Sequence, residues 1–463
     1  MTDELELLRD PVRPIPARSM PDREQGTVTS AWPAVPPGVV PAADLPPQPH
    51  RARIKLLHVI TRLAGGSGGN TLMSAAGMDR DRYDVWLAGA PGGQMWQEAR
   101  RSGVRAAPIP HMRERISPTD DLLALGELVR LMRRERFSIV HTHCAKAGLL
   151  ARVAARLTGT PVVVHTFHAL AAHQFIRRPR RELYLRLDRL ARPLADAYVA
   201  VAPTVARQVV ESRVAPPGQV IVIPSAVDLA RIPGDQDRTV RPELGIRPDV
   251  PVVGTVGRLV RQKGPLDFVR MAALVKRVRP ETAFVMVGDT TLESRPLEQQ
   301  TKDEARRLGV DVVFTGFRAD APRIASAFDV FVVSSLYEGL GRALTEAMAS
   351  GRPIVATAVN GVPDLVEPGA TGLLAPPADP AGLARAVTWL LDHPQEARRM
   401  GAQGRARVLA GFWPDTMCDE LDALYARLLG VPRTAPVPAH RSDAPSVRLR
   451  RPGNGVARLN EPR

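Results

Sequence analysis

The chain has 463 residues, of which 44% are hydrophobic and 24% are charged, and its formal net charge is +15. This length suits two domains with full-sized cores, and no stretch approaches the ~18 uninterrupted apolar residues of a membrane-spanning helix. A basic chain can attract nucleic acid, but aromatic residues make up only 4% and no zinc-finger or base-stacking pattern appears. We therefore expect a globular protein that does not bind nucleic acid.

The two ends differ in composition from the rest of the chain. Residues 1–50 hold proline-rich runs such as "PPGVVPAADLPPQPH", and residues 431–463 are similar but more basic, so both are predicted to be disordered. The start lacks the apolar core of a secretory signal, which predicts a cytoplasmic protein. Cys144 and Cys418 have no metal-type spacing. The sequence does not exclude a disulfide between them, but reduced thiols are favoured in that compartment.

Between the two ends, short β-branched runs alternate with helical stretches such as 121–135 and 147–158. In the first half of the chain, strands are predicted at residues 54–60, 83–89, 138–143, 161–167, 197–202 and 220–224. This alternation predicts a parallel sheet covered by helices. We assign residues 51–230 to this N-terminal domain.

A polar segment with proline and glycine, residues 231–250, is interpreted as an interdomain linker. The alternation then restarts, with strands predicted at residues 251–257, 282–288, 311–316, 329–335, 353–357 and 372–376. Residues 251–411 are predicted to form a second doubly wound α/β domain, and residues 412–430 a terminal helix. Ligands of such sheets bind beyond the carboxyl ends of the strands, so two facing domains predict a central cleft.

The predicted strand ends carry two candidate anion-binding features. Four glycines fall in the five positions from Gly65 to Gly69, where they suit either backbone contact with a phosphate or a flexible turn. The run is neither a dinucleotide-binding fingerprint nor a P-loop. In the second domain, Arg258 and Lys263 follow a strand end, where they could clamp a diphosphate or be solvated surface cations. Lys263 precedes a helix N-terminus, where a cation is unfavourable, and this favours a function.

Residues 139–170 contain four histidines, His141, His143, His165 and His168. No carboxylate ligand lies beside them, so no metal site is expected. His168 follows a strand end and is predicted to face the cleft, whereas the other three are interpreted as structural.

Two carboxylates, Glu338 and Glu346, belong to the stretch "LYEGLGRALTEAMASGRPIVA". Glu338 is predicted in the loop after a strand, and Glu346 on the next helix, which ends at Gly351. On one continuous helix they would lie on different faces, but Gly339 and Gly341 let the loop fold back over the helix start. The pattern leaves open whether both carboxylates bind a ligand or whether Glu346 is only a surface charge.

A specific resemblance rests on four stretches of the chain. They are "EGLGRALTE" with its E-x7-E form, its sequel "AMASGRPIVATAVNGVPDLVEPGATGLLAPPAD", "GRLVRQKG" and "VHTFHAL". Over residues 54–430 the chain closely resembles glycosyltransferase family 4, retaining nucleotide-sugar transferases with the GT-B fold of two Rossmann-like domains. The resemblance implies a donor site on the C-terminal domain and an acceptor site on the N-terminal one. It implies no cofactor and no divalent metal, because two cations and backbone dipoles take the metal's place.

The resemblance also implies roles for individual residues. Arg258 and Lys263 would bind the donor diphosphate, Glu346 the ribose hydroxyls and Glu338 the transferred sugar. The other implied site residues are Leu340 and Gly341, whose backbone lies near the phosphates, the cleft histidine His168, and Gly66, which closes on the donor.

The expected reaction moves a hexosyl group from a nucleotide-diphosphate sugar, with UDP preferred over GDP as the nucleotide, to a glycan, lipid-linked or small-molecule acceptor in cell-envelope polysaccharide or glycoconjugate synthesis. The alternatives are a GT-B-fold nucleotide-sugar epimerase and a non-catalytic sugar-nucleotide-binding scaffold. Epimerases lack this combination of "GRLVRQKG" with E-x7-E. Relatives often carry a Gln-Glu pair where this chain has Gly68 and Gly69, a departure that concerns acceptor-side contacts.

Residues 175–194 hold seven arginines among leucines. The pattern fits an Arg-rich surface helix, and it also fits a helix that lies on an anionic membrane and serves a lipid-linked acceptor. On the second interpretation the protein is peripheral on the inner face of the plasma membrane.

Overall fold

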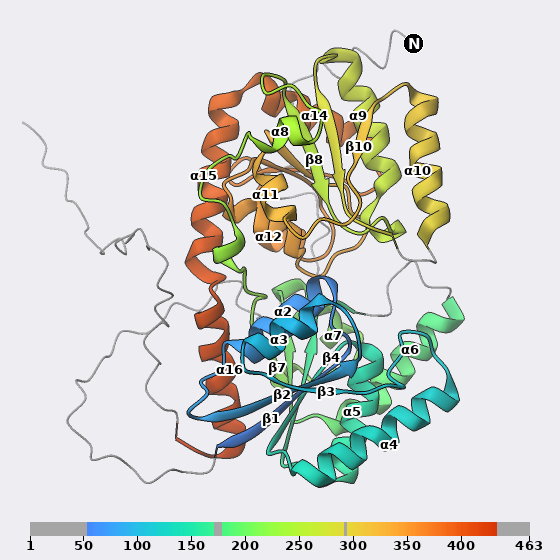
Figure 1. The fold of residues 1–463 in the computed structure, drawn as a ribbon, viewed down its shortest axis with the longest axis vertical. Helices are drawn as coiled ribbons and strands as arrows, with labels where there is room; N and C mark the ends of the chain where they lie inside the picture. Colours follow the sequence, from blue (N-terminus) through green and yellow to red (C-terminus); the bar gives the residue numbers. More distant parts are fainter. Residues whose placement is uncertain (1–52, 171–177, 291–293, 433–463) are drawn as a thin grey trace, which may run out of the picture.

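The computed structural model describes residues 53–170, 178–290 and 294–432. The predicted disordered leader lies outside these residues, as does the predicted tail beyond Pro432. Two helix-covered sheets lie one above the other in Figure 1, the N-terminal one in blue to green and the C-terminal one in yellow to orange. Each sheet is built from its own half of the chain, as the sequence predicts.

The N-terminal sheet has seven parallel strands in the order β3-β2-β1-β4-β5-β6-β7. Its strands are β1 (Ile54–Arg62), β2 (Tyr83–Ala90), β3 (Arg105–Pro108), β4 (Ile139–His143), β5 (Val162–Phe167), β6 (Ala197–Ala200) and β7 (Val220–Val222). The sequence analysis missed β3. Its sequence "RAAP" has no β-branched or aromatic residue, and only pairing with β2 at the sheet edge makes it a strand.

The C-terminal sheet has six parallel strands in the order β10-β9-β8-β11-β12-β13. Its strands are β8 (Val252–Val256), β9 (Ala283–Val287), β10 (Val312–Phe314), β11 (Val330–Val333), β12 (Ile354–Thr357) and β13 (Leu373–Ala375), all six of which were predicted. The strand order reverses between β8 and β11 here, and between β1 and β4 in the first sheet. Such switch points are where open parallel sheets bind ligands.

Helices cover both sheets (Figure 1). Those of the N-terminal half are α2 (Gly65–Ala76), α3 (Gln94–Arg101), α4 (Pro118–Glu135), α5 (Ala145–Leu157), α6 (Arg178–Leu190) and α7 (Pro203–Glu211). Those that follow are α8 (Val240–Glu243), α9 (Pro265–Val278), α10 (Arg295–Leu308), α11 (Ala321–Ser326), α12 (Arg342–Ala349), α13 (Val362–Leu365), α14 (Pro380–Asp392), α15 (Pro394–Gly411) and α16 (Pro414–Leu429). Strands β4, β5, β11 and β12 are buried along their whole length, as expected for parallel strands between two helical layers.

The last helix, α16, packs against α2 of the N-terminal domain. Tyr83 on β2 donates a 2.7 Å hydrogen bond to Asp422 of α16. Helices α15 and α16 thereby run along one side of both domains (Figure 1). Cys144 and Cys418 are free thiols, and burial raises the pKa of Cys418 to about 12.

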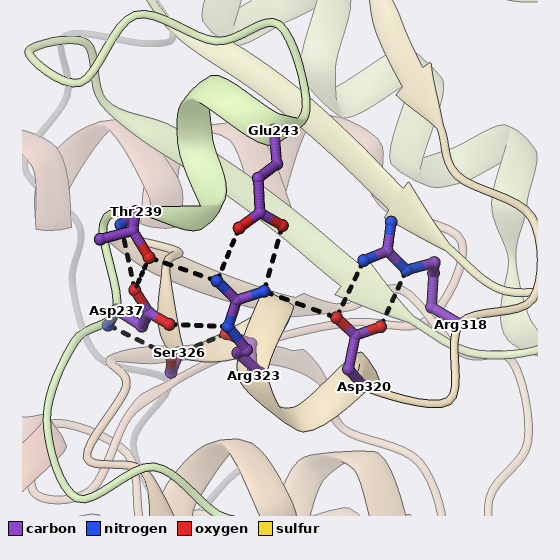
Figure 2. A network of polar contacts seen from close by, with 7 residues as sticks. All are labelled: Asp237, Thr239, Glu243, Arg318, Asp320, Arg323 and Ser326. Carbon is purple, nitrogen blue, oxygen red and sulfur yellow. Dashed lines mark hydrogen bonds and ion pairs between the residues drawn. The ribbon is translucent and has the colours of Figure 1, made fainter.

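The segment between the domains is tied to the C-terminal domain by Arg323 of α11 (Figure 2). The Arg323 guanidinium donates to Asp237 at 2.8 Å and to both oxygens of Glu243, at 2.7 and 3.1 Å. It also donates to the Thr239 hydroxyl at 3.2 Å. A bidentate guanidinium–carboxylate contact fixes both distance and orientation, so this network holds the segment in one place.

We expect Arg323→Ala to lower the melting temperature, and the loss to shrink in high salt, which screens exposed charges. The hydrogen bonds from Arg323 lower the pKa of Glu243. A carboxyl with a depressed folded-state pKa stabilises the protein above its unfolded pKa, about 4.3, and loses that effect as pH falls. The difference in melting temperature between wild type and Arg323→Ala should therefore be largest near neutral pH and shrink below about pH 4.

The matched control is Arg306→Ala, because Arg306 forms an exposed ion pair with Asp303 within one helix. Differential scanning calorimetry of both variants across pH makes the comparison. Equal, pH-independent losses would contradict a special role for Arg323.

Candidate active site

A pocket opens at the switch point of the C-terminal sheet. Its lining comes from the ends of β8 and β11, the turn before α9, and the start of α12. Arg258, Lys263, Glu338 and Gly341 all line it. Four of the site residues proposed from the sequence therefore line the same pocket.

Inside this pocket the predicted cation and carboxylate face each other. The Lys263 ammonium lies 2.5 Å from Glu338 Oε1, and the Ser335 hydroxyl donates to the same oxygen at 2.7 Å. Glu338 is only 8% exposed, so its charge is held by these two donors rather than by water. Gly264 has a φ of 59° at the start of α9, a left-handed conformation that glycine adopts without strain and that lets the chain turn at Lys263.

The start of α12 adds backbone donors to the same pocket. Gly341, the N-cap residue, has a φ of 87° and no side chain, and no cap hydrogen bond forms there within the described part of the chain. Gly341, Ala343 and Leu344 line the pocket, so the free N–H groups of the first turn lie beside it. Leu340 is buried and lies outside the lining. An uncapped N-terminus next to Lys263 makes this end of the pocket attractive to an anion.

Glu346 lies on the helix that follows the Glu338 loop, as the sequence predicts. It lies on α12, its Oε1 accepts a 3.0 Å hydrogen bond from Arg342, and it does not line the pocket. Burial raises its pKa, against the opposing effect of Arg342. In this structure Glu338 and Glu346 therefore each have their own cation, and they do not touch one another.

The glycine run is helical, so it is not the flexible turn that was one of its two interpretations from the sequence. Helix α2 begins at Gly65, so Gly66, Gly68 and Gly69 lie in its first turns. A Cβ at Gly69 would lie 1.4 Å from a terminal nitrogen of Arg342, and one at Gly66 would lie 3.6 Å from the Arg342 Cβ. The absence of side chains thus lets the C-terminal domain approach α2 closely.

Arg342 is the site residue that the sequence analysis missed. It stands inside "EGLGRALTE", where a lone arginine in a helical pattern has no distinguishing signal. Its contact with α2 joins residues far apart in the sequence, across two domains. It places a third cation between Glu346 and the glycines of the other domain.

His168 lies on the N-terminal side of the same region, directly after β5. Its backbone oxygen lies so near Gly339 that a Cβ there would be 1.8 Å away. Tyr337 reinforces the contact by donating from its hydroxyl to the Leu170 carbonyl at 2.7 Å. His168 thus lies beside the loop that carries Glu338, although it does not line the pocket itself.

The other three histidines of residues 139–170 are buried in the N-terminal sheet, as predicted. His165 bonds the Thr142 hydroxyl at 2.8 Å, and His141 bonds Thr166 at 2.6 Å and Tyr425 of α16 at 2.5 Å. Burial lowers the pKa of both rings well below the usual range, so both are neutral.

Two facing doubly wound domains, with a cation-lined pocket at the switch point of one sheet, define a nucleotide-binding enzyme of the GT-B class. Residues 64–231 match Glycosyltransferase Family 4, and residues 236–407 match Glycosyl transferases group 1. The chain therefore belongs to the glycosyltransferase group 1 / family 4 proteins. It is a glycosyltransferase that uses a nucleotide sugar, which sets aside the epimerase and scaffold alternatives.

Several characterised proteins are similar to this chain. A UDP-Gal:alpha-D-GlcNAc-diphosphoundecaprenol alpha-1,3-galactosyltransferase of Escherichia coli is 30% identical over 382 residues, covering 81% of this chain and 97% of that protein. An alpha-maltose-1-phosphate synthase of Mycolicibacterium smegmatis is 32% identical over 71% of this chain and 86% of its own length. Anabaena HepE, solved with UDP and glucose, has a TM-score of 0.71 at 20% identity and covers 81% of this chain and 100% of its own.

Proposed function

We propose that this protein is a retaining, metal-independent hexosyltransferase that uses a UDP-sugar and a lipid-linked acceptor. A nucleotide-sugar donor is supported by the pocket that lies beside Lys263, Arg258 and the start of α12. Two cations and a row of free N–H groups suit a diphosphate. UDP is preferred because the galactosyltransferase relative is named for a UDP-sugar and HepE was solved with UDP.

In the proposed reaction, the bond between the anomeric carbon and the diphosphate oxygen breaks, and its electron pair leaves with the diphosphate. The acceptor oxygen bonds the anomeric carbon on the same face, and its proton passes to the departing phosphate oxygen. Charge grows on the diphosphate, where Arg258, Lys263 and the α12 N–H groups would stabilise it. Such fixed donors supply the stabilisation that a divalent ion gives in other transferases.

The carboxylates take separate parts in this proposal. Glu338, held beside Lys263, accepts a hydrogen bond from a hydroxyl of the transferred sugar, and Glu346 accepts hydrogen bonds from the ribose hydroxyls. Glu346 is paired with Arg342 at 3.0 Å, so nucleotide binding would have to share or displace that contact. The backbone at Leu340 and Gly341 faces the phosphates. Gly66 closes on the donor, and His168 contacts the transferred sugar.

The test is nucleotide release from UDP-glucose, UDP-galactose, UDP-N-acetylglucosamine and GDP-mannose, each with and without EDTA. We expect turnover of a UDP-sugar that EDTA leaves unchanged, and NMR of the product should show a retained anomeric configuration. An absolute requirement for a divalent metal, or an inverted product, would contradict the mechanism. Turnover of GDP-mannose alone would overturn the choice of base.

The lipid-linked acceptor is supported by the surface of α6. Arg178, Arg180 and Arg181 are exposed, and so are Leu183 at 50% and Leu190 at 74%. Arginines beside exposed leucines on one helix suit an anionic bilayer surface. Residues 175–177 of the predicted basic segment lie outside the described residues. Within the described part of the chain, no helix is both long and apolar enough for a membrane span.

We expect the protein to sediment with vesicles that contain phosphatidylglycerol at low salt, and not with neutral phosphatidylcholine vesicles. Reversing Arg178, Arg180 and Arg181 to glutamate should abolish sedimentation, because each basic residue near an anionic surface contributes about 1 kcal/mol. The control reverses three exposed arginines of α10, namely Arg295, Arg306 and Arg307. Equal sedimentation of the two triple variants would disprove a membrane role for α6.

A further inference from the structure

Three histidines form a hydrogen-bonded chain that leads from the core of the N-terminal sheet to His168, beside the loop that carries Glu338. His58 Nδ1 lies 3.0 Å from His143 Nε2, and His143 Nδ1 lies 3.2 Å from His168 Nε2. His58 and His143 are 0% and 1% exposed, whereas His168 is partly exposed. The register that pairs His58 with His141 on β4 brings His58 and His143 together.

All three rings are neutral at physiological pH. Burial lowers the pKa of His58 to about 3 and that of His168 to about 4, and it lowers the pKa of His143 well below the usual range. A neutral imidazole has one N–H and one lone pair. Both nitrogens of His143 are engaged, so one donates and the other accepts, and only two arrangements of the protons are consistent with both bonds.

In the first arrangement, His58 donates from Nδ1 to His143, and His143 donates from Nδ1 to His168 Nε2. In the second, every bond is reversed, and His58 must carry its proton on Nε2. The His58 Nε2 is buried and has no hydrogen-bond partner in the described part of the chain. An unpaired buried N–H is rarer in proteins than an unpaired buried lone pair. The first arrangement is therefore favoured.

We infer that His143, backed by His58, is a positioning residue that holds His168 in the Nδ1–H tautomer, so that His168 is a hydrogen-bond donor and not a proton-accepting base. His168 Nδ1 has no partner among the described residues and is the ring nitrogen left for a ligand. An N–H there suits a hydroxyl or phosphate oxygen of the bound donor. This step rests on the proposed function only in taking His168 to face the nucleotide sugar.

A metal ion is the competing explanation for the cluster. His58, His141 and His143 offer nitrogens within 4.8 Å of one another. His141, however, has both nitrogens bonded, to Tyr425 and Thr166, and both nitrogens of His143 are also engaged. Among the residues that the structure describes, His58 is the one ring of the three with an unpaired nitrogen, and one nitrogen does not make a metal site.

The experiment compares His143→Asn with His143→Leu in the full chain. Asparagine carries an N–H where His143 has Nδ1, and can still donate to His168, whereas leucine has a similar shape and no donor. Long-range ¹H–¹⁵N NMR of ¹⁵N-histidine-labelled protein reads the tautomer without any substrate, and His168→Gln identifies the His168 signal. We expect the Nδ1–H tautomer in wild type and His143→Asn, and the Nε2–H tautomer, which free imidazole side chains prefer in water, in His143→Leu.

The kinetic counterpart uses the nucleotide sugar that wild type turns over. His143→Leu should lower kcat by about tenfold or more, as loss of an orienting partner does elsewhere, with asparagine restoring most of it. Melting temperature and UDP affinity serve as controls for folding. An Nε2–H tautomer in wild type would overturn the inference, and so would stoichiometric zinc that His143→Leu loses. If no nucleotide sugar is turned over, the proposed function fails while the NMR still decides the tautomer.

Discussion

Replacing Lys263 by alanine is expected to lower kcat/KM for the nucleotide sugar by about 10²- to 10³-fold, the loss measured when one preorganised donor to a developing anion is removed. The ammonium lies in the pocket, 2.5 Å from Glu338 and beside the uncapped start of α12. In the proposed reaction, its charge is fixed where the diphosphate gains charge in the transition state. Steady-state release of nucleotide measures the effect.

A matched control and a second-site variant separate catalysis from folding. Lys302 is ion-paired with Glu298 at 2.7 Å in the same domain, so Lys302→Ala removes an equivalent pair away from the pocket and should keep full activity. Lys263→Ala leaves Glu338 buried without its cation, and Lys263→Ala/Glu338→Gln should recover melting temperature but not turnover. Full activity in Lys263→Ala would remove this residue from the donor site.

Local sequence patterns predicted most of the fold because most of the strands are strongly β-branched runs between turn residues. The sequence analysis missed strand β3 because "RAAP" has no intrinsic strand preference, and its pairing with β2 depends on tertiary context. The helical conformation of the glycine run was missed for a related reason. Glycine is a poor helix former, yet α2 accepts it because Arg342 occupies the space beside Gly69.

The pocket at the switch point of the C-terminal sheet was predictable to the extent that its residues follow strand ends within one domain. Arg258, Lys263 and Glu338 satisfy that condition, and they line one pocket. Arg342 does not, because its partner surface is on the other domain, about which sequence spacing says nothing. The histidine chain was hidden for a different reason, since the contact between His58 and His143 depends on the register of β1 and β4 within one sheet.

The second large effect is expected from Gly339→Ala, which should lower kcat/KM by about 10²-fold or more, because misplacing reacting groups by about 1 Å costs that much. Gly339 follows Glu338, and a Cβ there would lie 1.8 Å from the backbone oxygen of His168 and 3.0 Å from its carbonyl carbon. A backbone carbonyl cannot swing aside as a side chain can. The loop carrying Glu338 would therefore have to move away from His168 and separate the two halves of the site.

The effect of this methyl group should be steric, because Gly339 is not among the glycines with positive φ. Its matched control is Gly126→Ala in α4, where a Cβ meets nothing within 4 Å and the activity should be unchanged. UDP affinity, measured by calorimetry, should fall less than kcat in Gly339→Ala, because Arg258 and Lys263 stay on the C-terminal domain while the contact with His168 is lost. A normal kcat with weakened UDP binding would mean that the alanine disturbs the nucleotide pocket alone, and that the approach of Gly339 to His168 has no part in sugar transfer.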